Sequence, residues 1–266
     1  MKNNKDQIQS EWLKKADLLT ETLPFMKRYA NKVIVVKFGG NAMGKKEYIT
    51  SFANDIVLLQ QVGMLPVVVH GGGPQIGEML SKLKIKTEFI NGLRVTDSAT
   101  IDVVEMVLSG VTNKSIVTAI SNSGAKSVGI SGKDGNLITA KRLTKIDENS
   151  DSNLEKVIDL GYVGEPEKID PQVIKALINE KMIPVIAPVG MGNDGLTYNI
   201  NADTAAGAIS AAMKASRMIM LTDVTGVLDK NGDLIPDLTI DQALELIEKK
   251  VVVGGMIPKV KPCIDA

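Results

Sequence analysis

Two long runs of β-branched residues, each followed at once by consecutive glycines, constrain the fold of this chain more than any other feature. The run at 32–38 (KVIVVKF) leads into the glycines at 39–40, and the run at 64–70 (MLPVVVH) leads into those at 71–73. Continuous apolar runs of this length are typical of strands buried on both faces of a parallel sheet. Ligands of such sheets bind at the carboxyl ends of the strands, where both glycine clusters fall.

Helix-like and strand-like patterns alternate along much of the chain. We expect further strands at 127–131, 181–189 and 217–224. We expect helices at 46–62, from the second glycine cluster to about residue 83, across 98–122 as one helix or two, at 201–214 and at 240–249. This alternation predicts an α/β fold with a mainly parallel central sheet that helices cover on both faces.

Three stretches stand outside this alternation. Residues 7–29 have the apolar spacing of an amphipathic helix, in which Pro24 predicts a kink or a break. The polar stretch 141–160 predicts a surface loop or an exposed hairpin. Pro258 opens a final helical stretch of about eight residues, which is too short to be stable by itself, so we expect the natural protein to continue past Ala266.

The ionisable composition narrows the possible chemistry. Lysine plus arginine number 31, as do aspartate plus glutamate, so no basic excess points to nucleic acid or to a membrane surface. The single cysteine, Cys263, and the single histidine, His70, exclude an internal disulfide and argue against a zinc site. No signal-peptide pattern opens the chain and no segment is predicted to reach membrane-spanning length, so we expect a cytoplasmic location.

The first glycine turn carries a lysine. Lys37 comes two residues before Gly39, which Gly40 follows. Its ammonium and the glycine N–H groups are therefore expected at the same strand end. Glycine lets the backbone approach an anion closely enough for several N–H groups to contact it. A tight turn beside a solvated lysine explains the same residues, and the motif alone does not decide between these interpretations.

His70 and the glycines at 71–73 form the second cluster. Three consecutive glycines cost backbone entropy, and in front of a helix they suit an anion-binding turn. HGGG also occurs in esterases, but the chain has no G-x-S-x-G nucleophile elbow and no second histidine to act as a base. The Walker, dinucleotide-binding and protein-kinase motifs are missing too. We expect His70 to pack or to hydrogen-bond rather than to catalyse.

Polar residues at three further element ends complete the candidate site. Asn199, Asn201 and Asp203 surround the start of an alanine-rich helix, where the last two are also ordinary capping residues. Asp223 closes a strand and is suited either to accept ribose hydroxyls or to form a turn. Lys259 lies in the first turn of a helix, where the dipole disfavours a cation unless an anion binds there. Such a set fits phosphoryl transfer, which needs positioning and charge neutralisation more than covalent chemistry.

Nine stretches of the sequence together resemble the amino acid kinase family. They follow the family's order through residues 32 to 260: KFGGNAM (37–43), VVVHGGGPQI (67–76), NGLRVTD (91–97), VGISGKD (128–134), GYVGE (161–165), IPVIAPVG (183–190), YNINADTAA (198–206), LTDVTGVL (221–228) and GGMIPKV (254–260). NGLRVTD, GYVGE and YNINADTAA resemble members that act on N-acetyl-L-glutamate, and differ from carbamate, uridylate and aspartate kinases. The resemblance implies a three-layer sandwich with two lobes around the parallel sheet.

The resemblance assigns catalytic and nucleotide-binding roles. Lys37 and Lys259 resemble the two lysines that stabilise the transferring phosphoryl group, and Asp203 resembles the aspartate that orients them. Gly39 and Gly40 resemble the turn that touches the ATP phosphates.

The resemblance also assigns the residues that would hold the substrate and the ribose. Gly72 and Gly73 resemble the turn that cradles the γ-carboxylate of the substrate. Arg94 resembles the residue that pairs with the α-carboxylate, and Asn199 the residue that hydrogen-bonds the same substrate. Asp223 resembles the residue that faces the nucleotide ribose.

The implied reaction is ATP-dependent phosphorylation of the γ-carboxylate of N-acetyl-L-glutamate to an acyl phosphate, a step of arginine biosynthesis. Mg²⁺ is implied on the ATP phosphates, with no metal site made by protein side chains. Two alternatives stay open: another amino acid kinase of the glutamate or aminoadipate type, and a non-catalytic amino-acid sensor or inactive fragment on the same fold.

The resemblance implies three segments. Residues 1–30 are expected to form a helix that joins subunits into a dimer or a hexamer, as in arginine-inhibited members, or that packs on its own subunit. Residues 31–188 are expected to form the lobe that binds the acyl amino acid. Residues 189–266 are expected to form the nucleotide-binding lobe without the family's C-terminal tail, which supplies much of the site for the inhibitor arginine.

Overall fold

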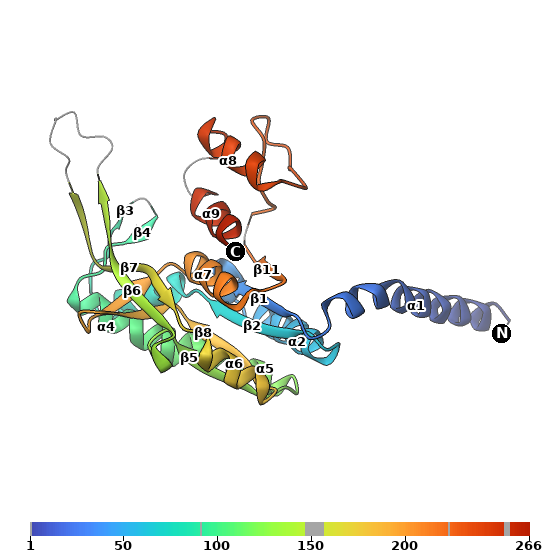
Figure 1. The fold of residues 1–266 in the computed structure, drawn as a ribbon. Coiled ribbons are helices and arrows are strands. Elements are labelled where there is room, and N and C mark those ends of the chain that lie inside the picture. The colour runs from blue at the N-terminus through green and yellow to red at the C-terminus, as the bar shows by residue number, and fades with distance from the viewer. Residues whose placement is uncertain (1, 91, 147–156, 223, 253–255) are drawn as a thin grey trace.

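The computed structural model describes residues 2–90, 92–146, 157–222, 224–252 and 256–266. Its centre is a five-stranded sheet in the order β11 (Arg217–Met220), β1 (Val33–Phe38), β2 (Leu65–His70), β8 (Ile183–Ala187) and β5 (Ser127–Ser131). Every neighbouring pair in this sheet is parallel, which confirms the predicted parallel sheet (Figure 1). The last strand is shorter than the predicted 217–224, because it ends at Met220.

Helices cover both faces of the central sheet, which gives three layers. Val36 and Val68 lie in a core cluster with side chains of α2 (Lys46–Gln61) and α5 (Asn113–Asn122). The alternate residues of the same strands lie in a second cluster with side chains of α6 (Gln172–Asn179) and α7 (Ala202–Met213). Burial of each such aliphatic side chain contributes about 1.5–3 kcal/mol. The sequence therefore predicted the layers correctly.

A second β structure, a closed four-stranded barrel, was not expected. It contains β6 (Ile138–Ile146), β7 (Val157–Ile169), β9 (Val189–Gly192) and β10 (Thr197–Ile200). The single strand expected at 181–189 is wrong, because β8 and β9 belong to different sheets and are separated by Pro188, which has no N–H to donate. The antiparallel pair of β6 and β7 agrees with the hairpin alternative for 141–160, of which residues 147–156 lie outside the described part of the chain.

The stretch Ser98–Asn122 is helical throughout. It consists of α4 (Ser98–Glu105), the π-helix η2 (Met106–Thr112) and α5. By length and apolar composition this run is able to cross a membrane, contrary to the expectation that no segment reaches that length. A core helix of a globular protein meets the same criteria, and Leu108 and Ile116 pack into core clusters.

Helix α1 (Lys2–Tyr29) extends away from the rest of the molecule (Figure 1). It continues through Pro24, so of the kink or break expected there the break is wrong; a proline removes one i→i−4 bond, and here the surrounding turns remain helical. Large apolar side chains of this helix are exposed: Trp12, Leu13, Leu18, Leu19, Leu23 and Phe25.

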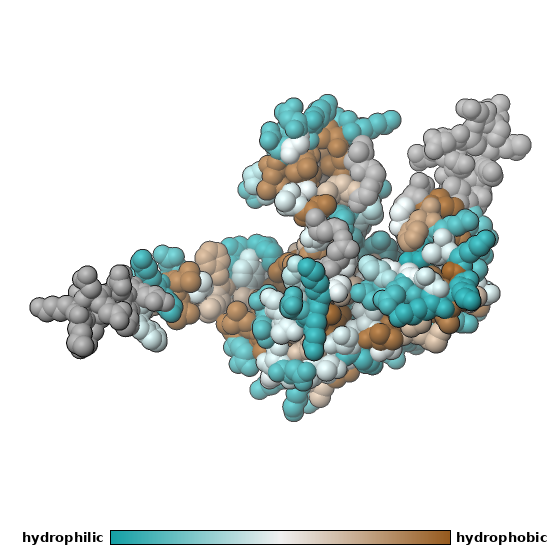
Figure 2. Space-filling model, turned by 180° about the vertical axis from the view of Figure 1, so that it is seen from behind, coloured by the Kyte–Doolittle hydropathy of each residue, from teal (hydrophilic) through white to brown (hydrophobic). Residues whose placement is uncertain are grey.

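The C-terminal part of the chain has a small core of its own. It is built by α8 (Ile240–Glu248) and α9 (Ile257–Asp265), with Ala243, Val252 and Val260 buried at its centre. Figure 2 shows apolar side chains gathered on the group that carries α8, which stands apart from the main body. Helix α9 lies between that group and the central sheet, packed on α7 (Figure 1).

Candidate active site

Two lysines from distant parts of the chain meet at one carboxylate. Nζ of Lys37 lies 2.8 Å from Oδ1 of Asp203, and Nζ of Lys259 lies 3.5 Å from Oδ2 of the same side chain. The Lys37 and Asp203 side chains are each 8% exposed, whereas that of Lys259 is 25% exposed. These three residues, called the lysine–aspartate cluster below, together carry one net positive charge.

Three element ends hold the lysine–aspartate cluster. Lys37 is the penultimate residue of β1, Asp203 lies in the first turn of α7, and Lys259 lies in the first turn of α9. Asn201 caps α7, because its Oδ1 accepts hydrogen bonds from the N–H groups of Asp203 at 2.8 Å and Thr204 at 3.2 Å. The expected capping role of Asn201 is confirmed, and it fixes the backbone from which the Asp203 side chain projects.

Helices α7 and α9 approach closely, which lets Lys259 reach Asp203. A Cβ on Gly207 of α7 would lie 2.8 Å from the carbonyl oxygen of Pro262 and 2.9 Å from its Cβ. Any larger residue at this position would push the helices apart and would lengthen the Lys259–Asp203 contact.

The first glycine turn lies directly against the Lys37 ammonium. A Cβ on Gly39 would lie 3.0 Å from Nζ of Lys37, so a side chain there would displace the lysine. Gly40 has a φ of 71°, a left-handed conformation that glycine adopts without strain. Gly71 of the second turn is close by, because its N–H donates to the carbonyl of Phe38 at 2.8 Å. The two turns therefore lie side by side at the ends of β1 and β2.

The second glycine turn leads into α3 (Gly73–Lys82), and Gly72 is its N-cap residue. A Cβ on Gly72 would lie 2.4 Å from Cδ2 of Leu108, whereas a Cβ on Gly73 would meet nothing within 4 Å. Within the described part of the chain, no acceptor bonds the N–H of Gly72 or of Gly73. Free N–H groups at a helix N-terminus are suited to bind an anion.

Arg94 is a buried guanidinium at the start of α3. It ends the strand β4 (Leu93–Arg94), which pairs with β3 (Phe89–Ile90). Its Nη2 donates to the Gly73 carbonyl at 3.0 Å, its Nη1 donates to Oγ1 of Thr87 at 2.8 Å, and its Cζ lies 4.6 Å from the centroid of the Phe89 ring. Burial lowers the pKa of the guanidinium, which remains charged. No described carboxylate forms an ion pair with it, so it is available to an anionic ligand.

Asn199 and Arg94 are connected through a residue that the sequence did not single out. Nδ2 of Asn199 donates to Oγ1 of Thr96 at 3.4 Å, and this hydroxyl donates to the Arg94 carbonyl at 2.8 Å. Thr96 is fully buried and accepts from the N–H of Tyr162 at 2.7 Å. A Cβ on Gly161 would lie 2.1 Å from the Thr96 carbonyl oxygen. Thr96 belongs to the motif NGLRVTD and Gly161 to the motif GYVGE. The occurrence of both motifs in one chain was the sequence signal for this contact.

One predicted residue has no described position. Asp223, expected at the ribose, lies outside the described residues. The other nine predicted residues are described. Lys37, Gly39, Asp203 and Lys259 are joined by the contacts given above, and Gly40 follows Gly39 in the same turn. Gly72 and Gly73 follow Gly71, which bonds to Phe38. Arg94 donates to the Gly73 carbonyl, and Thr96 connects it with Asn199.

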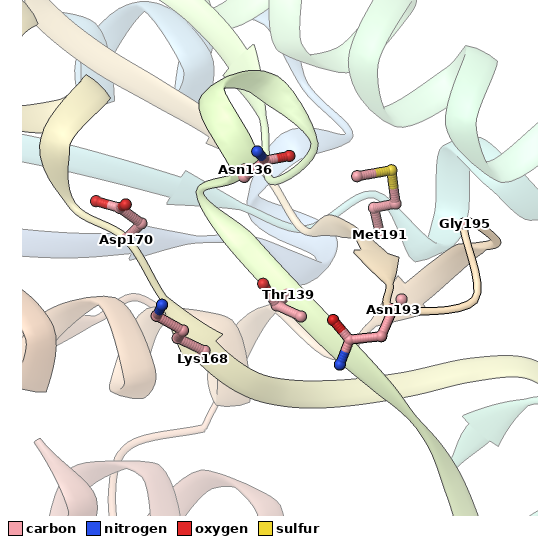
Figure 3. Close-up of a pocket in the computed structure, with 8 residues that line it drawn as sticks. Asn136, Thr139, Lys168, Asp170, Met191, Asn193 and Gly195 are labelled. Atoms are coloured by element: carbon pink, nitrogen blue, oxygen red, sulfur yellow. The ribbon is translucent and has the colours of Figure 1, made fainter.

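A separate cavity of about 480 Å³ lies on the barrel (Figure 3). It is lined by Asn136, Thr139, Lys168, Asp170, Met191, Gly192, Asn193 and Gly195. None of these residues belongs to the lysine–aspartate cluster or to the glycine turns. The cavity has one lysine and one aspartate in its lining, without the converging positive charge that a polyphosphate requires. This cavity is therefore separate from the candidate site at the lysine–aspartate cluster.

Comparison with known proteins agrees with this geometry. A family model described as "Amino acid kinase family" matches residues 32–266. Acetylglutamate kinase of Gluconobacter oxydans is 59% identical over 251 residues, which are 94% of this chain and 85% of that protein. Acetylglutamate kinase of Rhodospirillum centenum is 56% identical over 256 residues, which are 96% of this chain and 84% of that protein.

A solved structure, smu.665 from Streptococcus mutans UA159, is 30% identical with a TM-score of 0.73, and the match covers 88% of this chain and 89% of that one. The sequence motifs, the fold and the convergence of the two lysines thus indicate the same family. The chain belongs to the amino acid kinase family.

Proposed function

We propose that this chain transfers the γ-phosphoryl group of ATP to the γ-carboxylate of N-acetyl-L-glutamate and forms an acyl phosphate for arginine biosynthesis. The observation that carries the proposal is the lysine–aspartate cluster beside two adjacent glycine turns. Relatives named acetylglutamate kinase, more than half identical over nearly the whole chain, support the choice of substrate.

The acceptor oxygen attacks the γ-phosphorus in line. A new O–P bond forms as the bond between the γ-phosphorus and the β,γ-bridging oxygen breaks, and ADP keeps that electron pair. The carboxylate is already ionised at neutral pH, so no general base is required. The ammonium groups of Lys37 and Lys259, oriented by Asp203, stabilise the charge on the phosphoryl oxygens.

Arg94 and Asn199 hold the other end of the substrate. A guanidinium has five N–H donors, and only two contacts of Arg94 use them within the described structure. The remaining donors suit the α-carboxylate of the substrate. The free N–H groups of Gly72 and Gly73 then cradle the γ-carboxylate.

The nucleotide lies on the other side of the transferring phosphoryl group. Gly39 and Gly40 contact the ATP phosphates, and Asp223, which lies outside the described residues, is the proposed partner of the ribose hydroxyls. The residues present fit a polyphosphate, because two ammonium groups converge there and the glycine turn at Gly39 lies directly against one of them. Mg²⁺ on the phosphates supplies further charge neutralisation when bound. Among the described residues, no group of three or more His, Cys, Asp and Glu is placed to hold a metal.

The proposal extends to organisation and regulation. Residues 31–188 form the lobe for the acyl amino acid, and residues 189–266 form the lobe for the nucleotide. The exposed apolar side chains of α1 support self-association of residues 1–30 into a dimer or a hexamer. Arginine is the proposed feedback inhibitor, and the cytoplasm the proposed location.

A direct assay tests the proposed function. ATP and Mg²⁺ are supplied with N-acetyl-L-glutamate, L-glutamate, L-aspartate or L-2-aminoadipate, and the acyl phosphate is trapped with hydroxylamine. We expect trapped product with N-acetyl-L-glutamate and little with the other three. A preference for glutamate or aminoadipate would overturn the substrate assignment. A folded protein that turns over none of them would favour the sensor or the inactive fragment.

A further inference from the structure

We infer that His70 is a positioning residue for the second glycine turn: its ring holds the Gly71 carbonyl and thereby aims the N–H of Gly72 at the bound anion. The inference rests on the anion-binding role proposed for that turn and adds a residue that takes no part in the chemistry proposed above. His70 is the last residue of β2 and is fully buried.

The contacts of the His70 ring select one tautomer. Nδ1 lies 2.8 Å from the Gly71 carbonyl oxygen, which only accepts, so Nδ1 carries the proton. Nε2 lies 3.2 Å from Nδ2 of Asn113. That amide nitrogen also lies 2.9 Å from the Val185 carbonyl oxygen and 3.3 Å from the Ile130 carbonyl oxygen, which both only accept, so it is the NH₂ group. Its two hydrogens are shared among these two oxygens and Nε2, which accepts. Both ring nitrogens therefore require the same neutral form.

The surroundings of Asn113 hold this arrangement firmly. Oδ1 of Asn113 accepts from Nζ of Lys114 at 3.2 Å, and that ammonium also donates to the Gly129 carbonyl at 2.8 Å. A Cβ on Gly129 would lie 1.7 Å from Oδ1 of Asn113, so only glycine admits the amide there. A chain of hydrogen bonds thus runs from Lys114 through Asn113 and His70 to the glycine turn.

The ring stays neutral throughout the physiological range. Burial lowers the pKa of His70 to about 4, the bond to Gly71 opposes this shift, and the nearby charge of Lys114 adds to it. A charged ring would have to donate from both nitrogens, and Nε2 faces the NH₂ of Asn113, which is itself a donor. The neutral ring is thus the form that fits the contacts.

Peptide geometry carries the effect of the ring to the site. In a trans peptide the C=O and the following N–H point in opposite directions. The Gly71 carbonyl points toward the buried His70 ring, so the N–H of Gly72 points away from it. The N–H of Gly71 is fixed as well, because it donates to the Phe38 carbonyl at 2.8 Å. Glycine has no side chain to limit its rotation, so these bonds set the direction of the turn.

The tautomer is measured first, because the chain contains a single histidine. In protein without a histidine tag and labelled with ¹⁵N-histidine, long-range ¹H–¹⁵N correlation spectra contain the ring signals of His70 alone, so no resonance assignment is needed. At pH 7 we expect a neutral ring in which Nδ1 is protonated and Nε2 is unprotonated. A ring protonated at Nε2, or a charged ring, would overturn the inference whether or not the protein is a kinase.

Variants then test the consequence for the reaction. His70→Leu removes the donor but keeps an apolar side chain in the core, and His70→Asn keeps an N–H donor near the Nδ1 position. We expect His70→Leu to lower kcat/KM for N-acetyl-L-glutamate at least about 10-fold, less than the 10²–10³-fold cost of losing such a donor outright. We expect His70→Asn to recover most of that loss.

Val68→Ala is the matched control for damage to the core. Val68 is fully buried on the same strand and its side chain makes no polar contact. This variant is expected to lower the Tm and to leave kcat and KM unchanged well below that temperature. His70→Leu within twofold of the parent protein, or equal losses in His70→Leu and His70→Asn, would contradict the inference. If His70→Leu does not fold, the ring spectra decide the inference, and a His70→Asn protein that loses kcat/KM at least about 10-fold while Val68→Ala does not would contradict it.

Discussion

Nζ of Lys37 and Oδ1 of Asp203 lie 2.8 Å apart with both side chains 8% exposed, so a buried ion pair joins the end of β1 to the start of α7. Removal of one partner from such a pair leaves the other charge buried without compensation. Lys259 shares the same carboxylate at 3.5 Å but is 25% exposed. The two lysines are therefore expected to contribute equally to phosphoryl transfer and unequally to stability.

Lys37→Ala and Lys259→Ala test this difference. Both variants are expected to lower kcat by about 10²-fold or more, because each removes a cation from the phosphoryl group. Lys37→Ala is also expected to lower the free energy of unfolding by up to about 3–5 kcal/mol, whereas Lys259→Ala lowers it by about 1 kcal/mol or less. Steady-state kinetics and urea unfolding measure the two effects.

Lys82→Ala is the control for charge removal. Lys82 forms an exposed 2.7 Å pair with Glu78 on α3, so its loss is expected to change neither kcat nor stability appreciably. Unchanged turnover in Lys37→Ala or Lys259→Ala would refute the catalytic role of that lysine.

The adjacent glycines 72 and 73 provide a matched pair of substitutions. In Gly72→Ala the new Cβ meets Leu108, a core residue, at 2.4 Å, so we expect a loss of about 1–3 kcal/mol of stability. In Gly73→Ala nothing lies within 4 Å of the new Cβ, so stability is expected to stay the same or to rise slightly. Differential scanning calorimetry of both proteins compares them.

A second substitution separates the clash at residue 72 from other causes. Leu108→Ala in the Gly72→Ala background removes the atoms that the new Cβ meets. The double variant is expected to be more stable than the sum of the two single losses predicts. Additive losses would show that Gly72 is required for a reason other than its contact with Leu108.

The sequence predicted the central sheet because its strands carry their signal locally. Runs such as 32–38 and 64–70 are apolar on both faces, and the structure buries both faces. The strands of the barrel have no such signal, because β6 and part of β7 have mixed polar sequences. These segments form strands because they pair with neighbouring strands of the barrel, and not because of their own sequence preferences.

The candidate site likewise has features that a local motif predicts and one contact that it does not. The glycine turns and the Asn201 cap follow from short motifs and are found where the motifs place them. The meeting of Lys259 with Asp203 spans 56 residues and depends on the close approach of α7 and α9 at Gly207. No local pattern predicts such a contact, so the pairing followed only from the resemblance to a family. Thr96, which connects Asn199 with Arg94, was missed although it lies in the motif NGLRVTD, because a motif does not show which distant side chains one of its threonines contacts.

Arg94→Lys tests the planar fork of the guanidinium. A lysine keeps the charge but cannot donate to Thr87 and Gly73 and still bind a carboxylate with two parallel bonds. We expect KM for N-acetyl-L-glutamate to rise by about 10-fold or more, with a much smaller change in KM for ATP. Arg28→Lys, at an exposed arginine of α1 whose guanidinium lies over the Tyr29 ring, serves as the control and should change neither constant. Equal increases for both substrates would remove Arg94 from the acyl amino acid site.

Acid is expected to destabilise the protein through His70. The folded-state pKa is about 4, below the ordinary value of 6.5. As the pH falls below 6.5 the ring of the unfolded chain binds a proton, whereas the folded ring does not until about pH 4. Stability is therefore lost as the pH falls between these values, by about 3 kcal/mol in full and about 2 kcal/mol at pH 5.

Urea unfolding between pH 7 and pH 5 measures this dependence, and His70→Asn isolates it. Carboxylates titrate in both proteins, but the variant lacks the imidazole. We expect the variant to lose about 2 kcal/mol less than the parent protein over this range. Parallel curves for the two proteins would mean that His70 titrates normally in the folded state.

The exposed apolar side chains of α1 are expected to drive association, and Trp12 provides the probe. Trp12 is the chain's only tryptophan and is 68% exposed, with Leu19 and Leu23 exposed on the same helix. If these side chains are buried between subunits, dilution should shift the tryptophan emission to longer wavelength as the mass from light scattering falls. Leu19→Glu places a charge among the apolar side chains and should weaken association, whereas Glu21→Gln on the same helix should not. An emission maximum that is independent of concentration, in a protein that remains an oligomer, would place the subunit contact elsewhere.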